Sequence, residues 1–280
     1  MRNNLMTENH IKSFEKYLYE NEKSDITVKK YLCDIKKFSN YIGKGAVEKA
    51  DVLSYKEELS RKYSASSANS MLAALNSFFR FWGCAELCVK QFKIQKKIYC
   101  AEEKELSKSE YIRLVKIAEK KKKNRLSLLL QTICGTGIRV SELAFITVEA
   151  VKRGEAVVSC KGKTRNIFIV SSLRKKLLEY SRKHNLKSGM LFTTKSGKPL
   201  DRSNIWREMK SVCEEANVSK GKVFPHNLRH LFAREFYRIE NDIAKLADIL
   251  GHSSINTTRI YIITTGKEHR RRMENMNLIL

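Results

Sequence analysis

The chain has 280 residues, of which 42% are hydrophobic and 30% charged. No apolar run approaches the ~18 residues that a membrane-spanning helix needs, so a membrane-embedded protein is excluded. Fifty-five basic and thirty acidic residues give a formal net charge of +25. Residues 1–100 carry 18 basic and 11 acidic groups, and the remainder carries 37 and 19. A basic excess in both halves favours contact with nucleic acid, although a ribosome-associated factor with a basic surface would share it.

The cysteines and the first residues predict where the protein resides. There are 7 cysteines, an odd number, and no two of them form a Cys-x-x-Cys pair. This pattern argues against a disulfide framework or a zinc ribbon and fits a reducing compartment. Residues 1–8 contain no signal-peptide apolar region, so a cytoplasmic protein is expected. Cys134 and Cys160 lie in apolar surroundings and are expected in the core.

Apolar residues at helical spacing predict a helical first domain over residues 1–90. Gly43 and Gly83 stand where helix C-caps are expected. Four helices are predicted in this domain: 11–19, 27–42, 51–60 and 65–82.

A basic linker over residues 91–105 is predicted to lead into a second domain, 106–280. Ser107 or Ser109 should cap its first helix, in a capping-box pattern with Glu110. The second domain is expected to be helical, with a loop at 120–125 and with Asp201 or Ser203 capping a helix over 205–216. Its one β-hairpin is predicted from strands 156–160 and 166–170 around a turn at 161–165. The predicted fold class is therefore mainly α with a small β-sheet.

Two basic residues of the second domain indicate a catalytic role only when they are considered together with the other motifs. Arg139 lies in the string Gly-Thr-Gly-Ile-Arg-Val-Ser-Glu-Leu, where glycines end one helix and the next begins. It is expected at a helix start, off the core face, where an arginine is usually a surface residue or an ion-pair partner of Glu142. Lys161 falls in the hairpin turn, where a lysine is normally only solvated.

A third group follows Pro225, which suits a helix's first turn. At ~100° per residue, His226, Arg229 and His230 fall on one side of this helix, without a carboxylate. Such a face suits an anion. A metal is not expected, because the His226–His230 pair lacks the glutamate of zinc helices and Arg229 would repel a cation. The opposite, core-facing side is expected to hold Leu228, Leu231, Phe232 and Ile239.

The last features lie at the end of an apolar helix that stops at Gly251. His252 is thereby held in a tight turn, and Ser254 can cap the next helix. Tyr261 follows nine residues after His252. Alone, a tyrosine on a helix usually fills a core or an interface.

In their order, the strings G-T-G-I-R-V-S-E-L, H-N-L-R-H and L-G-H-S-S…T-T…Y resemble the catalytic domain of the tyrosine recombinases, the phage-integrase and Xer-type family. The resemblance is close over residues 106–261. The first domain is more loosely similar to the family's helical, SAM-like core-binding domain. The family's active-site roles carry over to Arg139, Lys161, His226, Arg229, His252 and Tyr261. Lys163, two residues from Lys161, leaves the lysine assignment open.

The resemblance implies that the tyrosine attacks a DNA phosphate and forms a 3′-phosphotyrosyl link. Arginines suit the clamping of phosphate oxygens, a histidine can take the phenol proton, and a lysine can protonate the departing 5′-oxygen. His230 is expected to support the structure, and Glu142 to orient Arg139. Neither a metal nor another cofactor is expected, and the sequence has no Walker-type Gly-rich motif for ATP.

The implied partners are double-stranded DNA with an inverted-repeat core site and further copies of the chain, in a tetramer on two duplexes. A simple Xer-like or mobile-element enzyme is expected, and the sequence leaves integration, excision, inversion and resolution open. Residues 266–280 could dock on a neighbouring subunit, pack on their own domain or fray. The alternatives are a type IB topoisomerase-like enzyme and a DNA-binding protein without catalysis.

Overall fold

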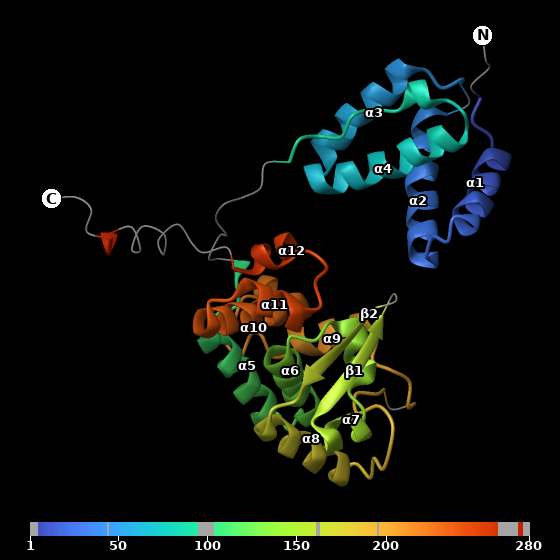
Figure 1. Cartoon of the computed structure of the whole chain (residues 1–280). Coiled ribbons are helices and arrows are strands. Elements are labelled where there is room, and N and C mark those ends of the chain that lie inside the picture. Colours follow the sequence, from blue (N-terminus) through green and yellow to red (C-terminus); the bar gives the residue numbers. More distant parts are fainter. Residues whose placement is uncertain are drawn as a thin grey trace. The chain divides into compact units, whose positions relative to one another are not determined.

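A computed structural model describes residues 5–43, 45–94, 104–160, 163–194, 196–262 and 274–276. The chain divides into two compact units, residues 1–96 and 97–280 (Figure 1). Part of the predicted linker, Lys161 and most of the C-terminal segment lie outside the described residues. Within the described residues, no helix combines the length and the apolar character needed to cross a bilayer.

The first unit is a helical bundle in which α4 packs against the other three helices. Its core is rich in aromatic residues, and Phe14, Phe38 and Phe78 are fully buried. Gly43 ends α2 with φ of +74°, a conformation that favours glycine, so its predicted cap position is confirmed. The elements are α1 (Glu8–Glu20), α2 (Asp25–Ile42), α3 (Lys49–Lys62), α4 (Ala65–Phe81) and the 3₁₀ turn η1 (Ala85–Leu87).

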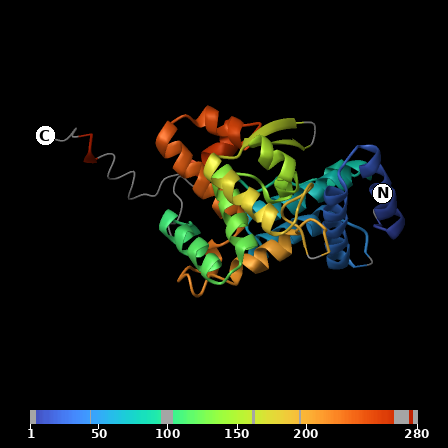
Figure 2. The same ribbon diagram turned by 90° about the horizontal axis from the view of Figure 1, so that it is seen from below.

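The second unit is built around α6, which contacts α5, α8 and α10. Helices α10–α12 and the hairpin lie side by side in Figures 1 and 2, and β2 contacts α11. The elements in chain order are α5 (Lys108–Lys120), α6 (Asn124–Thr136), η3 (Val140–Phe145), α7 (Val148–Arg153), β1 (Glu155–Cys160), β2 (Lys163–Phe168), α8 (Ser171–Lys183), α9 (Arg202–Lys210), η4 (Lys220–Lys222), α10 (Pro225–Glu240), α11 (Ile243–Leu250), α12 (Ile255–Arg259) and η5 (Ile260–Ile262). The mainly α fold with a small two-stranded sheet is as predicted.

Several predicted helix boundaries of the second unit are confirmed. Ser107 caps α5 in a capping box with Glu110. Pro225 is the first residue of α10, Gly251 ends α11 in the left-handed conformation, and Ser254 caps α12. These caps succeed because each depends on a local side chain or on glycine's backbone freedom.

The hairpin differs from the prediction. Strand β2 begins at Lys163, which pairs with Cys160, so Thr164 and Arg165 lie in the strand and not in the turn. A polar, Gly-containing run of this kind is typical of a turn. From Lys163 on it forms a strand because Arg165 stands opposite the buried Val158, on the inner face, where its two terminal nitrogens donate to the Ile249 carbonyl and to Glu142.

Two further expectations need correction, and the prediction for the cysteines is tested only for Cys134. Helix α9 ends at Lys210 instead of 216, because residues 211–217 form turns whose apolar side chains are nonetheless buried. Ile239 was expected in the core but is 75% exposed, in the last turn of α10. Cys134 is partly buried against the core, whereas the Cys160 side chain lies outside the described part.

Candidate active site

Arg229 is the most deeply buried charged side chain of the candidate site, with 2% exposure. Its guanidinium group donates to the carbonyl oxygens of Gly137 and, at 2.7 Å, Leu250. Its Nη2 lies 3.0 Å from Nε2 of His252, and its Nε has no partner among the described residues. Burial, assisted by the charge of Arg139, lowers the pKa of Arg229 to about 10, so the group remains a cation at neutral pH.

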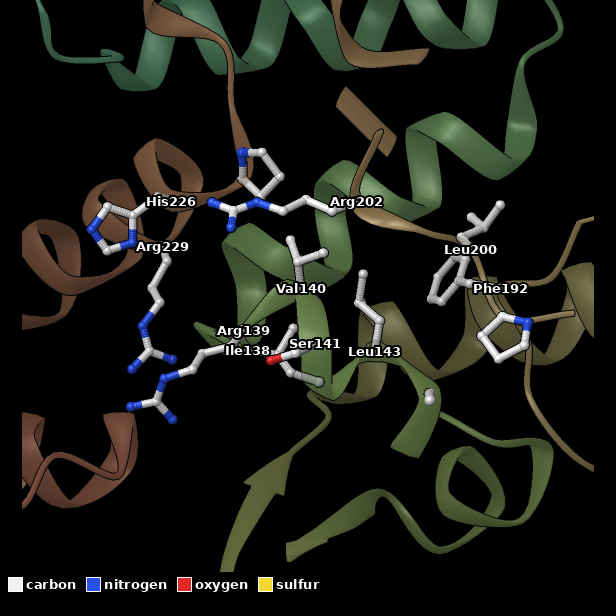
Figure 3. Close-up of a pocket in the computed structure, with 13 residues that line it drawn as sticks. Ile138, Arg139, Val140, Ser141, Leu143, Phe192, Leu200, Arg202, His226 and Arg229 are labelled. Carbon is white, nitrogen blue, oxygen red and sulfur yellow. The ribbon is translucent and has the colours of Figure 1, made fainter. Parts of the chain in front are cut away.

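Arg139 caps the 3₁₀ turn η3 and points toward the same space as Arg229 (Figure 3). Its Nη1 donates to Glu142 at 2.8 Å, and its Nη2 donates to the Gly251 carbonyl at 3.2 Å. The preceding Gly137 has φ of +62°, and a Cβ there would lie 2.5 Å from the Phe232 ring. The close approach of α6 to α10, which brings the two arginines together, therefore requires glycine at this position.

Glu142 joins Arg139 to Arg165, an arginine that was not predicted to belong to the site. The Glu142 carboxylate is 3% exposed and accepts from Arg165 Nη2 at 2.6 Å. Burial raises the pKa of Glu142, but hydrogen bonds from the backbone and side chain of Arg139 and from Arg165 outweigh burial and hold that pKa below its usual value. The expected contact between Glu142 and Arg139 is present.

Arg165 also donates to the carbonyl of Ile249, so it ties β2 to the end of α11. A Cβ on Gly251 would lie 2.4 Å from Arg165 Cδ, which leaves room only for glycine there. Alternate residues of a strand point to the same face, so a predicted strand beginning at residue 163 would place Arg165 on the same inner face as the buried Ile167.

His252 follows Gly251 and is held from both ring nitrogens. Its Nδ1 lies 2.8 Å from the Thr258 hydroxyl, and its Nε2 faces Arg229. Burial, with the charges of Arg229 and Arg139, lowers the pKa of His252 to about 4, so the ring is neutral at physiological pH.

Tyr261 stands on η5 and is 6% exposed, against Leu246 and Leu250. Its ring centroid lies 5.5 Å from that of His226, 4.2 Å from that of His230 and 5.3 Å from that of His252. Burial lowers the pKa of His226 and lowers that of His230 to about 4. The tyrosine is thus surrounded by neutral imidazoles next to Arg229.

The predicted lysine is not placed. Lys161 lies outside the described residues, and of Lys163 only the backbone, at the start of β2, is described. The choice between Lys161 and Lys163 therefore stays a prediction.

A cavity of about 480 Å³ opens beside Arg139 and Arg229 (Figure 3). His226 and Arg202 line it as well, and Leu143, Phe192 and Leu200 form an apolar side. Asp201, one of the two predicted caps, does cap α9, whereas Arg202, the first residue of α9, was not predicted to belong to the site. A second cavity of about 620 Å³ lies where Arg139, Arg165 and His252 meet. Among the described residues no cluster of potential metal ligands occurs, and the cationic lining suits an anion.

Family models match both units. The model of the "Phage integrase family" matches residues 104–268, and that of the "Phage integrase, N-terminal SAM-like domain" matches residues 11–82. The chain belongs to the phage integrase family of tyrosine recombinases. It is 31% identical to a tyrosine recombinase, XerA, of Pyrococcus furiosus, over 100% of this chain and 98% of the relative.

The fold of this integrase-family chain is also that of solved structures. A lambda integrase (75–356) dimer bound to a core site superposes with a TM-score of 0.72 at 19% identity, over 91% of this chain and 95% of the other. A lambda integrase tetramer bound to a Holliday junction gives 0.73 at 18% identity, over 92% and 78%. With a full-length relative of this kind, the protein is a site-specific DNA recombinase, and the topoisomerase-like and non-catalytic alternatives are not favoured.

Proposed function

We propose that this recombinase cleaves DNA through Tyr261 and conserves the bond energy in a 3′-phosphotyrosyl link. The observation that carries the proposal is the position of Tyr261, which contacts three histidine rings beside the buried cation of Arg229. A phenol needs help to ionise at neutral pH, since its free pKa is about 10. A neutral imidazole can take its proton, and neighbouring cations stabilise the phenolate.

In the proposed cleavage the Tyr261 oxygen attacks phosphorus, and the bond from phosphorus to the 5′-oxygen breaks. Arg139 and Arg229 clamp the non-bridging oxygens, where negative charge grows in the five-coordinate state. Glu142 holds Arg139 by a 2.8 Å hydrogen bond, which fixes the geometry of the clamp before DNA arrives.

The same site supplies the base and the acid of the reaction, so one proton is accepted and one is given in each cleavage. His226 accepts the phenol proton, because its side chain lines the cavity and its lowered pKa keeps the imidazole neutral at pH 7. His252 donates a hydrogen bond to the phosphate. Lys161, with Lys163 as the alternative, gives a proton to the leaving 5′-oxygen. Attack by a 5′-hydroxyl of the partner strand reverses these steps and releases the tyrosine.

The assembly proposed is a homotetramer on two duplexes with inverted-repeat core sites, acting in the cytoplasm. The lambda integrase tetramer bound to a Holliday junction supports this arrangement, as do the family membership and the +25 charge. An Xer-like or small mobile-element enzyme fits the match to XerA along the whole chain.

A nicked suicide substrate tests the nucleophile. The nick lets the fragment beyond the cut diffuse away, so the covalent complex accumulates and is visible on a denaturing gel. We expect Tyr261→Phe to abolish the complex, whereas Tyr237→Phe, a tyrosine packed against the same cluster, should retain it. A covalent complex that persists in Tyr261→Phe would refute the assignment.

The reaction type and the lysine are tested separately. Exchange of strands between two marked sites, without independent relaxation of supercoils, is expected. For the lysine, Lys161→Ala should slow cleavage more than Lys163→Ala, and a substrate with sulfur at the leaving 5′ position should restore the rate, because a thiolate leaves without protonation. Equal defects in both variants would leave neither lysine as the specific acid and overturn this part of the proposal.

A further inference from the structure

The imidazole of His252 makes hydrogen bonds at both nitrogens, and this fixes its proton. The Arg229 Nη2 group 3.0 Å from Nε2 can only donate, because a guanidinium has no acceptor. Nε2 must therefore present its lone pair to Arg229. The ring is neutral, so its single proton is on Nδ1 and points at the Thr258 oxygen 2.8 Å away. This state is the Nδ1–H tautomer.

The Nδ1–H tautomer cannot serve a phosphate. Nδ1 is turned to Thr258, which is fully buried, and Nε2 has no proton to give. A hydrogen bond from His252 to a phosphate oxygen requires the proton on Nε2. When Arg229 directs its hydrogens to the phosphate, Nε2 no longer has to accept from Arg229 and can carry the proton. Nδ1 then has a lone pair inside the protein, and this lone pair needs a hydrogen-bond donor.

We infer that Thr258 is a positioning residue that allows His252 to exchange tautomers without losing a hydrogen bond. In the free protein its hydroxyl accepts from Nδ1–H; with phosphate bound, the same hydroxyl rotates and donates to Nδ1. A hydroxyl is suited to this because it is both donor and acceptor. Water carries one proton from Nδ1 to Nε2, so the number of protons is unchanged. The inference rests on the proposed role of His252 as a phosphate ligand.

The position of Thr258 supports a dedicated role. It is the buried residue of the short helix α12, and among the described residues its hydroxyl has no hydrogen-bond partner besides His252. The neighbouring Thr257 is exposed. The two threonines thus provide matched positions, one turned to His252 and one turned to solvent.

Single-turnover cleavage of the suicide substrate tests the inference in the full-length protein. Thr258→Val has nearly the same shape but cannot hydrogen-bond, and we expect its cleavage rate to fall about 10- to 100-fold with the DNA dissociation constant unchanged. Thr258→Ser restores the hydroxyl and should cleave close to the wild-type rate. Thr257→Val is the control and should behave as wild type. A Thr258→Val protein that cleaves at the wild-type rate would overturn the inference.

The tautomer itself can be read by nitrogen-15 NMR of the imidazole rings, with His252→Gln used to assign the signal. The free protein should show the Nδ1–H form, and Tyr261→Phe bound to uncleaved DNA should show the Nε2–H form. The same form in both states would contradict the exchange, and this result does not depend on whether Thr258→Val folds. If His252→Gln cleaves normally, the proposed role of His252 fails; if it is impaired while Thr258→Val is not, only the inference fails.

Discussion

In the first unit, the buried Asn76 is paired with a single backbone position: its amide donates to the Val89 carbonyl at 2.8 Å and its oxygen accepts from the Val89 amide at 2.9 Å. In the second unit, the buried Arg229 donates to carbonyls and to His252, and its Nε is left without a partner in the described part of the chain. Both side chains are polar and inaccessible, with 8% and 2% exposure.

The difference separates a structural role from a functional one. Asn76 satisfies its own hydrogen-bonding groups within the protein, so its burial stabilises the fold. Arg229 is a buried cation without a carboxylate partner among the described residues. A buried charge without an opposite charge beside it lowers the free energy of unfolding. Its charge remains available to an anion from outside the protein.

The largest effect expected from this contrast is a loss of cleavage rate in the Arg229→Met variant. Loss of one clamp on the transition-state charge should slow cleavage about 1000-fold. The free energy of unfolding should change little, because removal of a buried charge offsets the loss of the hydrogen bonds to the Gly137 and Leu250 carbonyls. Urea unfolding and suicide-substrate cleavage measure the two quantities. Arg238→Met, on the exposed side of α10, is the control and should change neither. A marked loss of stability in Arg229→Met would break the comparison.

Glu142→Gln is expected to affect both quantities. The substitution leaves Arg139 and Arg165 without the charge that holds them, so cleavage should slow about 10- to 100-fold and stability should fall by about 3–5 kcal/mol. Glu179→Gln removes an exposed ion pair with Lys183 and should leave the urea midpoint and the cleavage rate unchanged. Wild-type cleavage by Glu142→Gln would show that Arg139 needs no orienting carboxylate.

Asn76→Ala should show the opposite pattern from Arg229→Met. Removal of the amide leaves the buried Val89 backbone unpaired and should lower the free energy of unfolding of the first unit by about 1–3 kcal/mol. The rate of cleavage by the folded protein should stay at the wild-type value. Asn40→Ala, at an exposed position of α2, is the matched control. A cleavage defect in Asn76→Ala, measured where the protein is fully folded, would contradict this assignment.

The smallest expected effect is a pH dependence of stability in the second unit. The pKa values of His230 and His252 are lowered to about 4, so between about 6.5 and 4 the unfolded chain binds protons that the folded protein does not. Stability should therefore be complete above pH 6.5 and decline as the pH falls toward 4. Single-tryptophan variants that retain Trp206 or Trp82 report the two units separately. A steeper decline reported by Trp82 would contradict the prediction.

Much of the fold was predictable because its signals are local. Apolar spacing gave the helices of the first unit, and caps such as Ser107 and Gly251 set helix ends through their own side chain or backbone. Helix α9 was predicted too long for a physical reason. The turns after Lys210 bury residues such as Val212 and Ala216, so burial continues at helical spacing after the helix itself has ended.

The candidate site was predictable as a set of residues but not as a network. The order of motifs pointed to Arg139, His226, Arg229, His252 and Tyr261, and the structure brings these side chains together. Arg165 and Arg202 could not be predicted because their roles depend on residues far away in the sequence: Arg165 donates to the Ile249 carbonyl, and Arg202 lines the same cavity as His226. Their own neighbours in the chain carry no sign of those contacts.

The Gly137 carbonyl that accepts a hydrogen bond from Arg229 lies 92 positions away from it in the sequence. The hydrogen bond from Arg139 to the Gly251 carbonyl spans 112 positions. Contacts between such distant positions carry a high loop-closure entropy and form late when a chain folds. Helix α10, which bears Arg229, can appear early, but the clamp of Arg139 and Arg229 exists only after α6 and α10 have packed. A partly folded molecule therefore holds the tyrosine without its arginines and should be unable to nick DNA.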